Sequence, residues 1–288
     1  MSNLLVFQSD FGISDGAVSA MYGVAKSVST TLDLYDLTHD IPPYHIWEAS
    51  YRLAQTTSYW PEQTVFVSVV DPGVGSERLS VVVKTKANHY IVTPDNGTLT
   101  HLAQSVRISE ARIIDEKINR LAESFQSYTF HGRDVYAYTG ARLAAGKTSF
   151  EQIGPQLDVD QLVRFTTPEV TVNNRVITGT IDILDIRFGN LWTNIDKNYF
   201  YQEAIEYGDI LEVTILDDTQ QVYKNMMAFG RSFADTQVGE PILYINSLGK
   251  IAIALNQGSF ADAYHINAGT QSKIRIHKTT KTSDPFTK

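Results

Sequence analysis

The hydrophobic pattern of this 288-residue chain changes near residue 156, and this change constrains the fold more than any other feature. Before it, apolar strand-like segments alternate with segments of helical spacing, which predicts an α/β layered domain with a central sheet. After it, short strand-like runs separated by turns predict a small β-barrel or sandwich. We therefore predict an N-terminal α/β domain over residues 1–160, a linker over 161–172 and a smaller C-terminal β-rich domain over 173–288.

The expected elements follow from these periodicities. In the first domain we predict strands at residues 4–8, 32–37, 65–70, 80–85 and 90–93. The helices expected between and after them lie at residues 16–30, 45–59, 98–104 and 135–145. In the second domain we predict strands at residues 176–184, 210–215, 241–245 and 251–255.

Composition narrows the range of partners and locations. The net charge is −8 and there is no basic run, which argues against nucleic acid as a partner. The absence of cysteine excludes disulfides, a thiolate nucleophile and a cysteine-based metal site. We find neither a secretory signal pattern nor an apolar run of the roughly 20 residues that span a bilayer. We therefore expect a cytoplasmic protein that is not associated with a membrane.

Two aspartates follow predicted strands in the first domain. Asp71 comes directly after the strand at 65–70, and Pro72 and Gly73 then break that strand. The carboxyl ends of strands are where open α/β sheets build ligand sites, and Arg78 is near enough in sequence to fold back and pair with Asp71. Asp10 follows the first strand, where its carboxylate can either accept hydrogen bonds from a ribose diol or bind loop amides.

His131 lies in the loop before the helix expected at residues 135–145. An imidazole at this place can orient or deprotonate a water molecule, or it can simply cap the helix or pack against Phe130. In the second domain, Phe188 and Trp192 can sandwich a purine while Asp185 and Asn190 present polar edges, or the two aromatics can belong to the core.

Several other kinds of site are disfavoured. A glycine-rich dinucleotide loop and a Walker A motif are both absent, so we expect neither a dinucleotide cofactor nor ATP hydrolysis. Residues 12–16 match the serine-hydrolase elbow pattern, but no upstream segment is available for the second oxyanion donor. Asp10, Asp15, Asp71 and Asp95 offer too few carboxylates per loop for a typical cation site, so we expect no metal.

Taken together and in order, these motifs resemble one family, the S-adenosyl-L-methionine (SAM) hydroxide adenosyltransferases. These adenosine-forming SAM hydrolases are related to the SAM-dependent fluorinase and chlorinase. The matching segments span nearly the whole chain: Ser9-Asp10-Phe11-Gly12 with Asp15, Asp71-Pro72-Gly73-Val74-Gly75 with Arg78, Pro94-Asp95-Asn96-Gly97, Thr129-Phe130-His131-Gly132-Arg133-Asp134, Phe188-Gly189-Asn190-Leu191-Trp192-Thr193-Asn194, and Asn246-Ser247 with Asn256.

The resemblance implies hydrolysis of SAM to adenosine and methionine, with SAM as substrate and no cofactor. It also implies an α/β N-terminal domain over residues 1–160, a β-barrel C-terminal domain over residues 173–288, and a homotrimer whose active sites lie between neighbouring subunits. By the same resemblance, Asp71, Arg78 and His131 prepare the attacking water. The implied substrate-binding residues are Asp10, Asp15, Tyr44, Phe130, Asp185, Phe188, Asn190, Trp192, Phe233, Ser247 and Asn256.

The nature of the nucleophile follows from differences within this resemblance. The halogenases place hydroxyl side chains where this chain has Val74 and Gly132, and they lack an equivalent of His131. They carry an aromatic residue at the position of Asp71, so the resemblance implies water rather than halide. Basic residues near their methionine end correspond to Leu248 and Leu255, which leaves backbone amides to bind the carboxylate. The alternatives are a non-catalytic protein that binds SAM or adenosine, and a SAM-dependent halogenase.

Overall fold

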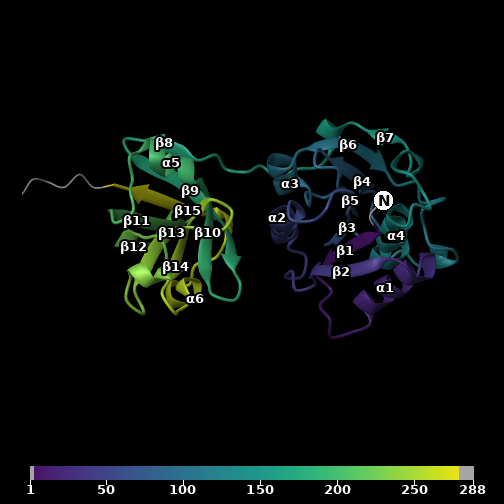
Figure 1. Cartoon of the computed structure of the whole chain (residues 1–288), viewed down its shortest axis with the longest axis horizontal. Coiled ribbons are helices and arrows are strands. Elements are labelled where there is room, and N and C mark those ends of the chain that lie inside the picture. The colour runs from purple at the N-terminus through teal and green to yellow at the C-terminus, as the bar shows by residue number, and fades with distance from the viewer. Residues whose placement is uncertain (1–2, 279–288) are drawn as a thin grey trace, which may run out of the picture. The chain divides into compact units, whose positions relative to one another are not determined.

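The computed structural model describes residues 3–278, which form two compact units that divide between Phe165 and Thr166 (Figure 1). This division falls inside the segment 161–172 that the sequence suggests as a linker. The first unit is an α/β domain and the second a closed β-barrel, so the predicted fold class is confirmed.

The N-terminal domain contains a mixed sheet with the strand order β2-β1-β3-β5-β4-β6-β7. Strands β2, β1, β3 and β5 run parallel, whereas β4, β6 and β7 pair antiparallel. The strand bounds are β1 Leu4–Ser9, β2 Asp33–Thr38, β3 Val65–Val69, β4 Ser80–Thr85, β5 Tyr90–Pro94, β6 Ile108–Ile113 and β7 Gln156–Leu157.

Helices cover both faces of this sheet. Helices α1 (Ala17–Val28) and α4 (Tyr138–Ala144), with the π-helical turn η2 (Gly132–Ala137), pack on the face that carries Leu5 and Phe7. Helices α2 (Ile46–Thr57) and α3 (Thr100–Ser105) share the opposite core, which contains Val6. Successive side chains of a strand point to opposite faces, so β1 contributes to both cores. The remaining short helices are η1 Ser124–Gln126, η3 Phe150–Gln152 and η4 Val159–Gln161.

The order of the strands determines where a ligand site can form. Strand β1 lies between β2 and β3, with Ser9 at the end of β1 opposite Val69 at the end of β3. The chain leaves β1 towards β2 on one side and returns as β3 on the other, which makes this edge a topological switch point. The loops that follow β1 and β3 carry Asp10 and Asp71, and they are neighbours for this reason.

The C-terminal domain is a closed barrel of seven strands within the described residues, in the order β9-β10-β14-β13-β12-β11-β15, and β8 pairs with β9 outside the ring. Pairing of β10 with β9 closes the ring and leaves a core of aliphatic and aromatic side chains inside. The strands are β8 Thr171–Asn173, β9 Val176–Asp185, β10 Asn190–Asp196, β11 Ile210–Asp217, β12 Gln220–Phe229, β13 Pro241–Ile245, β14 Lys250–Leu255 and β15 Gly269–His277. The helices are α5 Lys197–Gln202, η5 Phe233–Asp235 and α6 Phe260–Tyr264.

The sequence pattern did not predict strands β6, β7, β8, β10, β12 and β15. Strand β12 shows why: most of its side chains face solvent, and only Tyr223, Met227 and Phe229 are buried. Its position is determined by pairing with β11 rather than by its own hydrophobicity.

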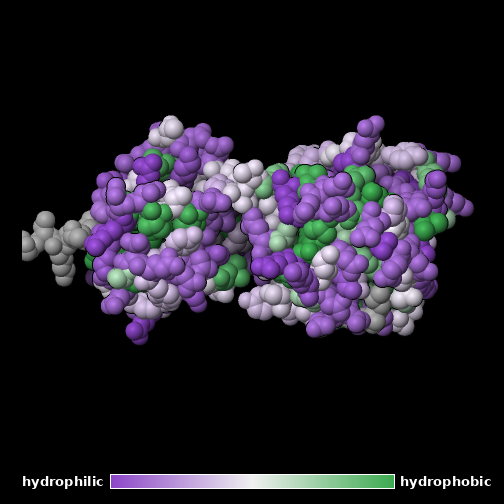
Figure 2. All heavy atoms as spheres, turned by 90° about the horizontal axis from the view of Figure 1, so that it is seen from above, coloured by the Kyte–Doolittle hydropathy of each residue, from purple (hydrophilic) through white to green (hydrophobic). Residues whose placement is uncertain are grey.

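The surface of each domain is mostly hydrophilic, with separate hydrophobic patches (Figure 2). Within residues 3–278, the helices are too short or too polar to cross a membrane.

Candidate active site

Asp71, Arg78 and His131 meet in the N-terminal domain. The Arg78 guanidinium binds the Asp71 carboxylate in a bidentate manner: Nε donates to Oδ1 at 2.7 Å and Nη2 donates to Oδ2. Nη2 also lies 3.3 Å from Nδ1 of His131. The Asp71 and Arg78 side chains are only 5% and 11% exposed, so their charges are largely shielded from water. The three groups that the sequence suggested for catalysis are therefore in one cluster.

The loop after β3 brings Arg78 back to Asp71. The amide of Val74 donates to the Asp71 carbonyl at 3.2 Å, and the amide of Ser76 donates to the Gly73 carbonyl at 3.0 Å. Gly75 has a φ of +80°, a backbone conformation that glycine adopts without strain. These consecutive turns reverse the chain within a few residues, which is why a local sequence pattern was sufficient to predict the ion pair.

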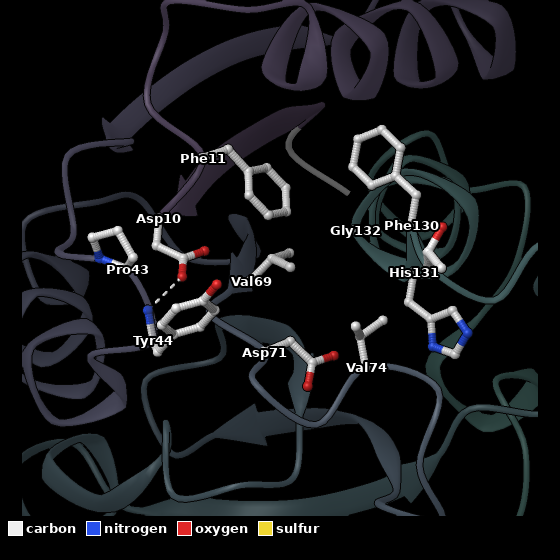
Figure 3. A pocket seen from close by; sticks show the side chains of 11 residues that line it. Asp10, Phe11, Pro43, Tyr44, Val69, Asp71, Val74, Phe130, His131 and Gly132 are labelled. Atoms are coloured by element: carbon white, nitrogen blue, oxygen red, sulfur yellow. Dashed lines mark hydrogen bonds between the residues drawn. The ribbon is translucent and has the colours of Figure 1, made fainter.

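Asp71 and His131 line a cavity of about 410 Å³ at the switch point of the sheet (Figure 3). The predicted substrate-binding residues Asp10, Tyr44 and Phe130 line the same cavity. The Tyr44 amide donates to Oδ2 of Asp10 at 2.8 Å, and Tyr44 has a left-handed backbone with φ of 69°. This backbone conformation is strained for a tyrosine, and it orients the Tyr44 amide towards the Asp10 carboxylate. The remaining lining residues are Phe11, Pro43, Val69, Val74, Thr129 and Gly132.

An aromatic pair forms the apolar side of this cavity. The rings of Phe11 and Phe130 meet edge to face with centroids 5.7 Å apart. A Cβ atom added to Gly132 would lie 3.0 Å from the Phe11 ring and 3.3 Å from Cγ1 of Val69. A larger residue where η2 begins would therefore have to displace the Phe11 ring or Val69 by a few tenths of an ångström.

A second network, which the sequence analysis missed, supports the loop that carries Asp10. Oγ of Ser9 lies 2.7 Å from Nδ1 of His39, and Nε2 of His39 lies 3.0 Å from Oδ1 of Asp36. The residue types are those of a serine-hydrolase triad, but Ser9 is fully buried and accepts the amide of Phe11 at 3.3 Å. The network therefore fixes the turn around Asp10 rather than supplying a nucleophile.

A separate cavity of about 630 Å³ lies on the C-terminal domain, beside the hairpin of β9 and β10. Phe188 and Phe233 are 66% and 43% exposed there and present open aromatic faces. Nδ2 of Asn190 lies 3.4 Å from Oδ2 of Asp185, at the polar side of the cavity. Asn256, the other predicted residue in this lining, donates through Nδ2 to the carbonyls of Phe233 and Thr236.

Trp192 takes a supporting position. Its Nε1 donates to the Tyr244 hydroxyl at 3.3 Å, and Tyr244, which the sequence analysis did not select, lines the cavity. Burial raises the pKa of Tyr244 to about 12, so its hydroxyl stays protonated and available as a donor. The indole therefore orients a hydroxyl instead of lining the cavity itself.

Besides Arg78 and Trp192, two further predicted residues lie outside both linings in the part of the chain that the structure describes. Asp15 is exposed before α1, and its Oδ1 accepts the amide of Ala17 at 2.9 Å. Ser247 is exposed in the turn between β13 and β14, where Oδ1 of Asn246 accepts the amides of Leu248 and Lys250. Among residues 3–278, no group of three or more acidic or histidine side chains is arranged to hold a metal ion.

Comparison with known proteins identifies the family. The N-terminal domain of the SAM hydroxide adenosyltransferases matches residues 5–154, and their C-terminal domain matches residues 179–273. The chain belongs to this family. The matched regions contain both cavities, so the family assignment covers the charged cluster and the aromatic lining alike.

Relatives of this family member carry two kinds of name. An (R)-S-adenosyl-L-methionine hydrolase from Salinispora arenicola is 33% identical and aligns with 93% of this chain and 96% of its own length. A fluorinase from Actinopolyspora mzabensis is 28% identical, over 94% and 96% of the two chains. A conserved Thermotoga maritima protein of solved structure is 30% identical, has a TM-score of 0.86 and covers 95% of this chain and 99% of its own.

Proposed function

We propose that this family member hydrolyses SAM to adenosine and L-methionine, by in-line attack of an activated water molecule on C5′. The main support for this reaction is one observation. The Asp71 carboxylate, the Arg78 guanidinium and the His131 imidazole meet beside a cavity that is also lined by Asp10. The hydrolase named from Salinispora arenicola supports the same reaction.

The chemistry requires an activated nucleophile more than an acid. The sulfonium sulfur takes the electron pair of the breaking C5′–S bond and leaves as neutral thioether, so it needs no proton. Free water has a pKa of about 15.7 and is a poor nucleophile. Asp71 and His131 would hold one water and take its proton as the O–C5′ bond forms, and that proton then passes to solvent. A positioned base contributes about 10² to 10⁴ in rate.

Substrate binding divides between the two sets of residues. Asp10 would accept hydrogen bonds from the ribose hydroxyls, and Asp15, Tyr44 and Phe130 would surround the ribose end. In the second set, the adenine and methionine groups would contact Asp185, Phe188, Asn190, Phe233, Ser247 and Asn256, and Trp192 would act through the Tyr244 hydroxyl. We propose that neighbouring subunits of a homotrimer contribute the two sets. SAM is then the substrate, and neither a metal nor a cofactor is needed.

Product analysis by chromatography tests this function. Purified protein incubated with SAM and a chelator is expected to release adenosine and methionine in equal amounts. Free adenine with ribose would instead indicate glycosidic cleavage. Tight binding of SAM by calorimetry without any product would identify a binding protein.

The fluorinase relatives make halogenation the second candidate. The same incubation in high fluoride or chloride distinguishes the two reactions, because a halogenase would form 5′-halo-5′-deoxyadenosine. We expect adenosine alone, since the residues that line this cavity beside Asp71 include Val74 and Gly132, which offer no hydroxyl group to a halide.

A further inference from the structure

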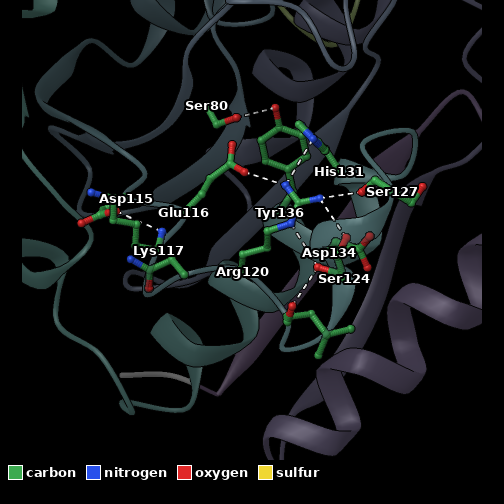
Figure 4. Close-up of polar contacts among 12 residues, drawn as sticks. Ser80, Asp115, Glu116, Lys117, Arg120, Ser124, Ser127, His131, Asp134 and Tyr136 are labelled. Carbon is green, nitrogen blue, oxygen red and sulfur yellow. Dashed lines mark hydrogen bonds and ion pairs between the residues drawn. The ribbon is translucent and has the colours of Figure 1, made fainter.

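Arg120, which the sequence did not single out, contacts His131 on the ring nitrogen opposite Arg78. Nη1 of Arg120 lies 3.4 Å from Nε2 of His131 (Figure 4). On the other side of the ring, Nη2 of Arg78 lies 3.3 Å from Nδ1. Arg120 belongs to the segment between β6 and η2 and is not among the residues that line the cavity. Any effect on the reaction would therefore pass through His131.

The Arg120 guanidinium is fixed in place by its other contacts. Its side chain is fully buried, and Nη1 donates to Oε2 of Glu116 at 2.7 Å. Nε donates to Oγ of Ser124 at 3.1 Å, and Nη2 donates to the Ser127 carbonyl at 2.8 Å. The ring of Tyr128 lies over the guanidinium, with its centroid 4.8 Å from the central carbon. So many partners leave Arg120 little freedom to turn away from His131.

The two contacts restrict the protonation state of His131. A guanidinium has only donors, so an imidazole nitrogen beside it must offer a lone pair. The imidazolium ion has no lone pair on either nitrogen and would direct two N–H groups at two cations. The neutral ring has one lone pair and can accept from one of the arginines. The geometry therefore favours the neutral ring over the charged one.

Burial of His131 acts in the same direction as this geometry, whereas the charges around the ring oppose one another. The charged groups that face it are Arg78, Arg120, Asp71 and Glu116, with the rings of Tyr128 and Tyr136 beside the two arginines. Burial is the largest cause that lowers the pKa of His131, and the two arginines lower it further. Glu116 and Asp71 oppose this shift, but each carboxylate is bound directly to a guanidinium.

We propose that Arg120 is a positioning residue: together with Arg78 it holds the His131 imidazole neutral and in one orientation at the edge of the cavity. This inference rests on the proposed hydrolysis for its purpose, since a neutral imidazole is the form that can accept a hydrogen bond or a proton from the attacking water. Glu116 has the opposite effect and moderates the influence of Arg120.

A pair of variants with opposite expected signs tests the proposal. Arg120→Met removes one cation beside the ring, and we expect the pKa of His131 to rise by about one unit. Glu116→Gln removes the carboxylate and should lower it. Titration of the His131 ring by NMR with labelled histidine measures both, with the signal assigned from His131→Gln. Arg112→Met is the matched control, because Arg112 is a partly buried arginine that binds the Gly154 carbonyl instead.

The pH profile of adenosine formation provides the second measurement. In Arg120→Met the acid limb of kcat should move to higher pH, and Arg120→Lys, which restores the positive charge, should return it towards the original position. If folded Arg120→Met and Glu116→Gln leave the His131 titration unchanged, the proposal is overturned. Because the titration needs no turnover, a protein that shifts as expected yet forms no adenosine would overturn the proposed function while supporting the effect of Arg120 on the ring.

Discussion

The two cavities of this protein are built on different physical principles. The N-terminal cavity carries buried ionic groups, each held by several hydrogen bonds, and its Asp71 and Arg78 side chains are almost shielded from water. The C-terminal cavity carries exposed aromatic faces with a few polar groups beside them. Charges interact strongly only when they are desolvated and fixed, whereas a flat apolar ring can bind to an open aromatic surface. Under the proposed function, this contrast corresponds to chemistry in the first cavity and recognition in the second.

The contrast predicts that damage to the first cavity affects kcat. Asp71→Asn keeps the shape of the side chain and removes its charge, so we expect kcat to fall by about 10² to 10⁴ with little change in KM. Steady-state kinetics measures both constants. Thermal unfolding of the variant checks that the domain stays folded when Arg78 has lost the charged partner Asp71. Asp33→Asn, at the exposed start of β2, is the control. Unchanged kcat in Asp71→Asn would remove the basis for assigning catalysis to this cluster.

The two domains should also respond oppositely to acid. Burial lowers the pKa of His101 in the first domain from 6.5 to about 4, so protonation favours the unfolded state. The free energy of unfolding of this domain should fall by up to about 3 kcal/mol as pH falls from 6.5 to 4. Burial raises the pKa of Asp182 in the barrel from 3.8 to about 6, so the barrel should gain up to about 3 kcal/mol as pH falls through that window.

Hydrogen exchange read by mass spectrometry, with peptides assigned to each domain, measures this divergence. His101→Phe keeps an aromatic ring against Trp47 and Tyr51 and should remove much of the acid sensitivity of the first domain. Asp182→Asn should flatten the response of the barrel. If acid changes the stability of both domains in the same direction, and His101→Phe and Asp182→Asn leave that response unchanged, these two buried groups do not govern the pH dependence.

Damage to the second cavity should appear in KM instead of kcat. Phe188→Ala removes an exposed ring on which a base can stack, an interaction worth about 1–3 kcal/mol, so KM should rise by about fivefold to 150-fold. Ile186→Ala is the matched control, since Ile186 is a neighbouring exposed apolar residue that does not line the cavity. A large fall in kcat for Phe188→Ala would contradict the division between chemistry and recognition.

The smallest expected effect concerns how tightly the first cavity is packed. Gly132→Ala places a methyl group 3.0 Å from the Phe11 ring, and we expect a loss of about 1–3 kcal/mol in stability. Gly23→Ala on α1 meets nothing within 4 Å and should add about 1 kcal/mol. Urea unfolding measures the difference in the free energy of unfolding between the two variants. Equal stabilities would show that the Phe11 ring moves aside at little cost.

Local sequence was sufficient for some parts of this site and not for others. The Asp71–Arg78 pair was predicted because both residues lie on one short loop, in which the proline and glycines predict turns. His39 was missed because no local signal marks it, and only the pairing of β1 with β2 brings it to Ser9. Arg120 was missed for a similar reason, since its role depends on contacts made after the chain has folded around His131.

By itself, the amino-acid sequence determined the two-part architecture, the family and five of the eleven residues that line each cavity. Periodic hydrophobicity and turn residues act over short distances and are therefore readable along the chain. The tertiary structure alone decided that His131 lies between two guanidinium groups, that Trp192 supports Tyr244, and that Asp15 and Ser247 lie outside the linings. Such placements depend on strand order and packing between distant segments, which no local pattern encodes.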